Sequence, residues 1–281
     1  MRTRTIGTDQ VSAIGLGEMQ LSLADRPDEA QGVRTIHAAL DAGVTFIDTA
    51  DAYCADGSEM GHGERLTAKA LSSYRDTAHV LVATKGGHTR DARGGWGTDG
   101  SPAYLRKACD ASLAALGVDV IDLYQHHRPD PTVPYEETLG ALKELHDAGK
   151  VRMLGLSNAD VDQIRQGVEI CGDALVSVQN QYAPNFRSSE PELELCTELG
   201  LAFLPWGPLG GAGRGSRSAG NAFTEVADGH GVSPQQVALA WMLARSPAVV
   251  PIPGSSRPET IADSAAAADL ELTPDELATL R

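Results

Sequence analysis

Short runs of apolar, mostly β-branched residues alternate with longer stretches of helical periodicity from one end of the chain to the other. A run of four or five such residues is typical of a strand that is buried in a parallel sheet. Eight runs of this kind are present, at residues 13–16, 44–47, 80–83, 120–124, 153–156, 176–179, 201–204 and 249–252. The alternation therefore predicts an α/β fold in which each strand is followed by a helix.

The intervening segments carry helix signals of their own. Segment 101–116 begins with Ser-Pro, a cap followed by a residue suited to the first turn. Segment 233–245 begins with Ser233 and has Gln236 three positions later, which is the spacing of a capping box. The apolar residues expected on one face of this second helix are Val237, Ala240, Trp241 and Ala244.

Eight strand–helix alternations without an obvious linker predict a closed (β/α)8 TIM barrel, in one domain over residues 1–281. An open, doubly wound sheet has the same local pattern and stays an alternative. The stretch Thr3–Val11 predicts an N-terminal β-hairpin ahead of the first strand, and segments 221–229 and 274–280 predict two extra helices.

Two irregular stretches, 86–100 and 207–220, are rich in Gly and Arg. In a barrel both follow strand ends, on the face where barrel enzymes carry their active sites. We therefore expect these loops to border the functional site.

Composition narrows the function classes. The chain has 42% hydrophobic and 22% charged residues and a formal net charge of -15, so its field disfavours nucleic acid and anionic membranes as partners. The N-terminus lacks the apolar core of a signal peptide, and no apolar run approaches the roughly 20 residues that cross a bilayer. The cysteines are isolated, without a metal-binding or disulfide spacing, at positions 54, 109, 171 and 196. A reduced, cytoplasmic protein is the expectation.

Polar residues at the strand ends supply the candidate chemistry. Asp48, Lys85 and His127 fall at or just past the carboxyl ends of the second, third and fourth strands, and Tyr53 lies in the loop after Asp48. An ammonium beside a phenol lowers the phenol pKa from its usual value of about 10. An aspartate beside the lysine keeps the cation paired. Such a phenol can protonate the oxyanion that forms when hydride reaches a carbonyl carbon.

At these residues the chain resembles the aldo-keto reductase superfamily, over nearly its full length. The matching pieces stand in family order: GLG at 15–17, GVTFIDTADAY at 43–53, ATK at 83–85, DLYQHHRP at 122–129, GKVR at 149–152, GLSN at 155–158, QNQY at 179–182 and IPGS at 252–255. The sequence following the first and seventh strands is most similar to a bacterial branch that includes pyridoxal reductases. The resemblance implies that Tyr53 is the general acid, that Lys85 and Asp48 tune it, and that His127 rather than His126 positions the carbonyl.

The resemblance also implies NADPH as the cofactor. Ser157, Asn158 and Gln179 match the positions that hold the nicotinamide carboxamide, and Trp206 the position that stacks on its ring. Further cofactor contacts are implied at the backbone of Gly207, Leu209 and Gly210 and at the 2′-phosphate site of Ser255, Ser256 and Arg257. The family's frequent lysine, arginine and asparagine are replaced by Gly254, Thr260 and Ser264. Arg257 can still offer a forked guanidinium, so NADPH is favoured and NADH is not excluded.

The substrate expected from this resemblance is a small aldehyde or ketone. The segment 128–135 after the fourth strand is short, which predicts an open pocket that discriminates weakly. Its expected lining is loop 207–220 together with Met19, Cys54, Trp96 and His126. The sequence does not indicate an oligomeric state.

Two other functions fit parts of the pattern. Potassium-channel β subunits resemble the same family and hold the same cofactor mainly as a sensor, which makes a cofactor-sensing binding module the main alternative. The adjacent histidines His126 and His127 suggest a second alternative, a metal-dependent hydrolase. Adjacent strand residues point to opposite faces, however, and no HxH or HExxH motif accompanies them. We therefore predict no metal site.

Overall fold

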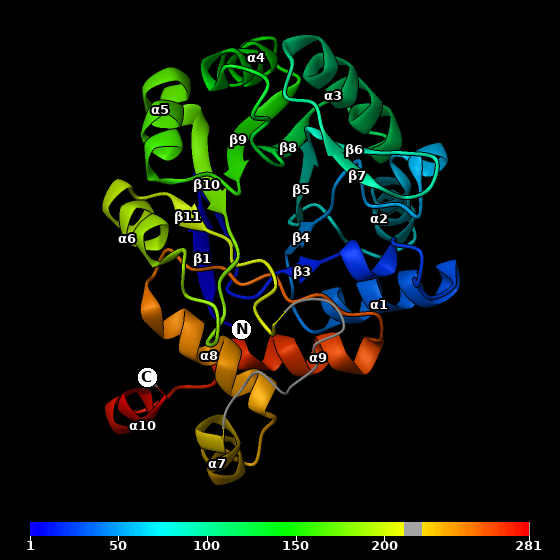
Figure 1. Ribbon diagram of the computed structural model, residues 1–281. Coiled ribbons are helices and arrows are strands. Elements are labelled where there is room, and N and C mark those ends of the chain that lie inside the picture. The colour runs from blue at the N-terminus through cyan, green and yellow to red at the C-terminus, as the bar shows by residue number, and fades with distance from the viewer. Residues whose placement is uncertain (211–220, 281) are drawn as a thin grey trace.

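The computed structural model describes residues 1–210 and 221–280. Its main sheet is a curled, parallel sheet of seven strands in the order β11-β10-β9-β8-β5-β4-β3 (Figure 1). The strands of this sheet are β3 Leu16–Gly17, β4 Phe46–Asp48, β5 Leu81–Gly86, β8 Ile121–His126, β9 Val151–Ser157, β10 Leu175–Gln179 and β11 Ala202–Phe203. Helices surround the sheet on the outside, so the predicted (β/α)8 barrel is confirmed and the open sheet is wrong.

The helices follow the strands around the barrel. The α-helices are α1 Glu29–Asp41, α2 His62–Ser72, α3 Pro102–Leu116, α4 Tyr135–Asp147, α5 Val161–Cys171, α6 Glu190–Leu199, α7 Asn221–His230, α8 Pro234–Arg245, α9 Pro258–Ala266 and α10 Pro274–Thr279. Short 3-10 helices are η1 Met19–Leu21, η2 Gly57–Glu59, η3 Gly172–Ala174 and η4 Ala267–Asp269. The two extra helices expected from the sequence are α7 and α10, which project from one side of the barrel (Figure 1).

The eighth predicted strand closes the barrel with a reduced set of hydrogen bonds. Segment 248–254 lies between β11 and β3, joined by isolated parallel bridges at Phe203–Val249 and Gly17–Gly254. Pro251 and Pro253 accept hydrogen bonds from Gly15 and Gly17 through their carbonyl oxygens. Because proline has no N–H, neither can donate one back, so regular strand pairing is interrupted.

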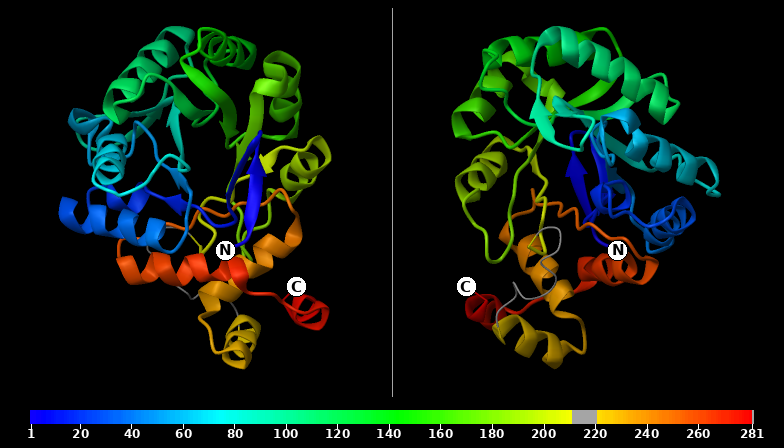
Figure 2. Two further views of the ribbon diagram at one scale, coloured as in Figure 1. Left: turned by 180° about the vertical axis from the view of Figure 1, so that it is seen from behind. Right: turned by 45° about the vertical axis from the view of Figure 1, so that its right-hand side comes forward.

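The predicted N-terminal hairpin is confirmed as β1 Thr3–Ile6 and β2 Asp9–Ser12. Its apolar side chains Ile6 and Val11 are buried with strand residues of the barrel interior, including Met153 and Val176. Gly7 turns the hairpin with φ +58°, and a Cβ there would lie 2.7 Å from the Met153 sulfur. The hairpin therefore covers one barrel opening, which Figure 2 shows in the view from behind.

A second hairpin lies where the sequence indicated only an irregular loop. Within residues 86–100, β6 His88–Arg90 pairs antiparallel with β7 Trp96–Thr98. It stands beside the opposite barrel opening, next to the end of β5 (Figure 1). Of the other irregular stretch, 207–220, residues 211–220 lie outside the described part of the chain.

Helix α8 differs from its prediction in two details. Ser233 caps the helix by accepting a hydrogen bond from the Gln236 backbone, but the Gln236 side chain donates to Asp263 of α9 instead of completing a capping box. The expected apolar face also omits Ala244, which is exposed. The helix is buried on most sides from Val237 to Leu243, because it packs between the barrel and neighbouring helices.

All four cysteines are buried free thiols. Within residues 1–210 and 221–280, no helix has the length and apolarity that crossing a bilayer requires.

Candidate active site

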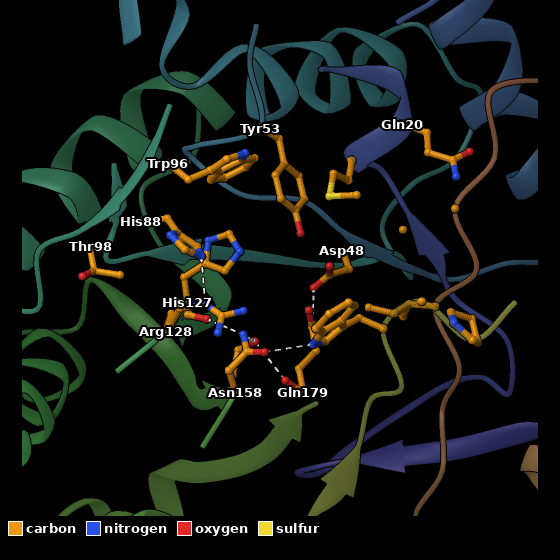
Figure 3. A pocket seen from close by; sticks show the side chains of 18 of the residues that line it. Gln20, Asp48, Tyr53, His88, Trp96, Thr98, His127, Arg128, Asn158 and Gln179 are labelled. Carbon is orange, nitrogen blue, oxygen red and sulfur yellow. Dashed lines mark hydrogen bonds between the residues drawn. The ribbon is translucent and has the colours of Figure 1, made fainter. Parts of the chain in front are cut away.

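The candidate aspartate, lysine and histidine lie where three strands end. Asp48 is the last residue of β4, Lys85 lies near the end of β5, and His127 directly follows β8. Parallel strands place their carboxyl ends at the same rim, so residues far apart in sequence converge there. Figure 3 shows Asp48, Tyr53 and His127 facing one space.

Lys85 is fully buried and makes three hydrogen bonds with its ammonium group. Its Nζ lies 2.6 Å from Oδ2 of Asp48, 2.8 Å from the carbonyl oxygen of Thr49 and 3.2 Å from the hydroxyl of Tyr53. All three ammonium protons are thereby used. The predicted dyad of lysine and aspartate is present in this arrangement, and Tyr53 is its third partner.

The second carboxylate oxygen of Asp48 is held by two amides. Oδ1 accepts a hydrogen bond of 2.9 Å from the side chain of Gln125 and one of 2.8 Å from Gln179. Sequence reasoning missed Gln125, which lies on the strand two positions before His127 and is fully buried. The period-2 alternation of a strand was the signal, because it puts both side chains on the inner face.

Burial and neighbouring charge set the proton affinities of the site. Burial raises the pKa of the Tyr53 phenol, and this outweighs the lowering effect of the Lys85 ammonium. The expectation of a lowered phenol pKa is therefore wrong for this arrangement. Burial lowers the pKa of Lys85, but the nearby Asp48 carboxylate more than compensates, so the net pKa shift is upward. The phenol is protonated and the lysine is charged at neutral pH.

His127 is a neutral imidazole. Burial, followed by the nearby Lys85 charge, moves its pKa well below the ordinary value. Its ring meets the Tyr53 ring edge-on, with the centroids 5.6 Å apart. A second histidine, His88 of β6, packs edge-on against it at 4.3 Å. Sequence reasoning missed His88, because it lies in the hairpin that had no strand signal.

His126 does not line the site, which corrects its predicted place in the substrate pocket. The side chain is fully buried and packs against Tyr135 of α4. Strand alternation turns it away from the barrel axis, whereas His127 faces the cavity. Across the described ranges 1–210 and 221–280, no three His, Cys, Asp or Glu side chains are grouped to hold a metal ion.

A cavity of about 650 Å³ opens above these groups. Its lining includes eleven predicted site residues: Met19, Asp48, Tyr53, Trp96, His127, Ser157, Asn158, Gln179, Trp206, Gly207 and Leu209. Cys54 does not line it, which is a second correction. Its side chain is fully buried, and the thiol is directed to the carbonyl oxygen of Ala52 at 3.4 Å.

The residues proposed for the nicotinamide form one connected wall of this cavity. The Asn158 amide donates to the carbonyl oxygen of His127 and to the hydroxyl of Ser157. Its oxygen accepts from the indole nitrogen of Trp206 at 3.2 Å. Asn158 has φ 57°, a left-handed conformation that asparagine tolerates better than most residues. Amide groups and an indole ring therefore stand side by side, as Figure 3 shows for Asn158 and Gln179.

The remaining predicted cofactor residues fall into two groups, one on the cavity wall and one outside it. Gly207 and Leu209 line the cavity, and the Gly210 N–H donates to the carbonyl oxygen of Gly207. The Ser255 hydroxyl is occupied in a turn, where it donates to the Arg257 carbonyl oxygen and accepts from the Arg257 N–H. The Ser256 carbonyl oxygen accepts from the side chain of Gln31. Of these positions Arg257 offers an exposed charge, although Glu259 lies 3.6 Å from its guanidinium.

A buried glutamate borders the site and was not expected from the sequence. Glu18 is fully buried beside Asp48, whose carbonyl oxygen accepts its backbone N–H. Its carboxyl group is hydrogen-bonded by the hydroxyls of Ser22 at 2.5 Å and Thr49 at 3.0 Å, and it forms no ion pair in the described part of the chain. Burial raises the pKa of Glu18 to about 8. An uncharged carboxyl group therefore supports Thr49, the residue whose carbonyl holds Lys85.

Comparison with known proteins gives one consistent result. The model of the aldo/keto reductase family matches residues 13–281. An uncharacterized oxidoreductase of Schizosaccharomyces pombe is 34% identical over 282 residues, covering 99% of this chain and 88% of that protein. The 6-dehydroglucose reductase of Novosphingobium aromaticivorans is 38% identical over 269 residues, covering 92% and 86%. The crystal structure of an aldo-keto reductase from Klebsiella pneumoniae in complex with NADPH superposes with a TM-score of 0.81 at 29% identity, covering 100% of this chain and 94% of that one.

Proposed function

The chain belongs to the aldo/keto reductase family, and from that premise we propose that it reduces a small aldehyde or ketone with NADPH, using Tyr53 as the proton donor. The observation that carries this proposal is the position of the Lys85 ammonium, 2.6 Å from Asp48 and 3.2 Å from the Tyr53 hydroxyl. The cation is paired and oriented before any substrate arrives, so little reorganisation accompanies the reaction.

The proton donated to the developing alkoxide comes from the Tyr53 hydroxyl. Burial keeps this phenol protonated, and the adjacent ammonium stabilises the phenolate that remains after the proton has left. His127 is neutral, so it can donate a hydrogen bond to the carbonyl oxygen without adding a second net charge. Asp48 keeps Lys85 in place and balances its charge.

The cavity wall fits a nicotinamide cofactor, which supplies the hydride when it is bound. Ser157, Asn158 and Gln179 would hold its carboxamide, and the Trp206 indole would cover its ring. Gly17, Gly207 and Gly254 line the same cavity. The Klebsiella pneumoniae relative was solved in complex with NADPH. Arg257 supports the choice of NADPH over NADH. Among the residues that the sequence assigns to the 2′-phosphate site, Arg257 is the one with an exposed positive charge.

The substrate is a carbonyl compound that enters at the open end of the cavity. Met19 and Trp96 line this end, and the exposed fraction of Trp96 is 47%. The relative from Novosphingobium aromaticivorans carries the name of a reductase of 6-dehydroglucose, an oxidised sugar. A hydroxylated aldehyde therefore belongs in any substrate panel, beside simple aliphatic and aromatic aldehydes.

Steady-state oxidation of NADPH and NADH against such a panel tests the proposal. We expect turnover with at least one aldehyde and loss of turnover in Tyr53→Phe. The competing function is a cofactor-sensing binding module. Tight NADPH binding without turnover of any carbonyl compound would favour that module and contradict the proposed enzyme.

A further inference from the structure

An arginine without an acidic partner stands at the substrate end of the cavity. Arg128 lines the cavity next to His127 and is exposed. In the described residues, no carboxylate lies within ion-pairing distance of its guanidinium, although the chain as a whole has a net charge of -15. Several other described arginines also lack a carboxylate partner, so it is the position of Arg128 on the cavity wall beside the reacting groups that calls for an explanation.

Two hydrogen bonds connect the Arg128 guanidinium, through His88, to the backbone of β7. Nδ1 of His88 lies 2.9 Å from the Gly97 carbonyl oxygen, which requires the proton of a neutral imidazole to be on Nδ1. Nε2 of His88 is then an acceptor, and the Nε–H of Arg128 points to it at 3.4 Å. The terminal nitrogens of Arg128 remain available for a ligand. Figure 3 shows Arg128 and His88 on the same side of the cavity as His127.

The surroundings leave this positive charge uncompensated. The Lys85 charge is balanced by Asp48, and burial lowers the pKa values of His88 and His127, so both are neutral at pH 7. Among the described residues that line the cavity, Arg128 is therefore the one charge without a counter-ion.

An adjacent hollow of about 400 Å³ shares Arg128 with the cavity and is lined by two acidic residues, Asp160 and Glu192. Asp160 uses Oδ1 to cap α5, and burial raises the pKa of Glu192. Neither residue lines the main cavity, so neither competes there for the guanidinium.

We infer that Arg128 binds an anionic group of the substrate, and that the preferred substrates are aldehydes or ketones that carry a carboxylate or a phosphate. The inference rests on the proposed carbonyl reduction and narrows its substrate class. A guanidinium offers a planar fork that matches either anion, and His88 orients it by fixing Nε. The cavity therefore has a polar anchor for discrimination, in place of the weak discrimination expected from the sequence.

Matched substrates test this inference with the full-length protein and NADPH. 4-Formylbenzoate is compared with its methyl ester, and glyceraldehyde 3-phosphate with glyceraldehyde, so the two anions are separate arms. We expect kcat/KM to favour the charged member of at least one pair by about tenfold or more, the effect of one charge-assisted contact. Arg128→Gln should abolish this ratio, and Arg128→Lys should retain part of it. Raised ionic strength should reduce the ratio in the wild type.

Arg106→Gln is the matched control, since Arg106 lies on the outer surface of α3 and pairs with Glu144. It should leave the ratio unchanged. Equal kcat/KM for charged and neutral members in the wild type would overturn the inference while leaving carbonyl reduction intact. Weaker NADPH binding in Arg128→Gln, with an unchanged substrate ratio, would assign the arginine to the cofactor and also overturn it. Absence of turnover with every carbonyl would instead contradict the proposed function.

Discussion

The amide nitrogen of Gln179 donates a 2.8 Å hydrogen bond to Oδ1 of Asp48. A residue that the sequence assigns to the cofactor thus also holds the carboxylate that pairs with Lys85. The Gln179 oxygen remains on the cavity side, where it can accept from a carboxamide. The cofactor wall and the proton-donating group therefore share one side chain, and a change at Gln179 reaches both.

Gln125 provides a matched comparison, because it makes the equivalent bond to Asp48 and does not line the cavity. We expect Gln125→Met to lower kcat with little change in NADPH affinity. Gln179→Met should lower kcat and also weaken NADPH binding, by roughly twofold to thirteenfold for one lost neutral hydrogen bond. Quenching of tryptophan fluorescence measures the affinity. Equal NADPH affinities in the two variants would show that Gln179 acts through Asp48 and does not contact the cofactor.

Tyr53→Phe removes one hydroxyl group and keeps the ring that packs against His127. Turnover should fall by at least about 10²-fold, the lower end for a lost general acid. NADPH affinity should change little, because the ring continues to fill its place. The comparison is made at saturating NADPH with the best aldehyde of the panel. An unchanged kcat would mean that another group donates the proton.

Lys85→Met and Asp48→Asn separate the two members of the dyad. Lys85→Met should remove most activity, because the phenolate loses the cation that stabilises it. Asp48→Asn keeps that cation and should be milder in kcat. Each variant leaves one buried charge of the pair without its counter-ion, so both should lose about 3–5 kcal/mol of unfolding free energy. Measurements of kcat and of urea denaturation on the same preparations separate the catalytic difference from this shared loss of stability. A small loss of activity in both variants would contradict the dyad.

Strand ends explain why the centre of the site was readable from sequence. The carboxyl ends of parallel strands share one rim, so recognising the strands that end near Asp48, Lys85 and His127 already brings these three together. The eighth strand was also recognised as an apolar run, although Pro251 and Pro253 deprive it of regular pairing.

Side-chain direction explains the errors. Cys54 and His126 lie next to true cavity residues in sequence, but their side chains turn into the protein, so proximity along the chain was misleading. His88 lies in a hairpin of Gly, Arg and Asp, where no apolar alternation marks a strand. Glu18 was missed because a glutamate is ordinarily exposed, and only packing shows that it is enclosed.

Arg257 gives a prediction on cofactor choice. One charge-assisted contact to the 2′-phosphate corresponds to a preference for NADPH over NADH of roughly tenfold to a hundredfold. Its 3.6 Å contact with Glu259 favours the lower end, because the carboxylate competes for the guanidinium. Arg257→Ala should weaken NADPH and leave NADH almost unchanged, as measured by fluorescence titration of both cofactors. An equal loss of affinity for NADPH and NADH would mean that Arg257 acts on the fold or on the pyrophosphate. Unchanged affinity for both cofactors would mean that Arg257 is a surface residue without a role in binding.

Glu18 makes the stability of the protein depend on pH. The pKa of its carboxyl group is about 8 in the folded chain and near 4.5 in an unfolded one, so folding favours the protonated form. The contribution of this group is fully present below about pH 4.5 and is lost as the pH rises through about 8. Each pKa unit corresponds to about 1.4 kcal/mol, so the loss amounts to several kcal/mol.

Glu18→Gln should remove that dependence, because an amide does not titrate. The surroundings of Glu18 can accommodate a glutamine. The Ser22 hydroxyl lies 3.1 Å from Nδ1 of His62, so it can donate to the imidazole and accept from the new amide. In urea denaturation, the free energy of unfolding of Glu18→Gln should rise relative to that of the wild type from pH 5 to pH 8. At pH 8 the variant should be the more stable protein. Glu144→Gln, on the surface, serves as the control and should follow the wild type. If the curves of Glu18→Gln and the wild type run parallel over this range, Glu18 is ionised in the folded protein throughout, and the two hydroxyls of Ser22 and Thr49 suffice to hold its charge.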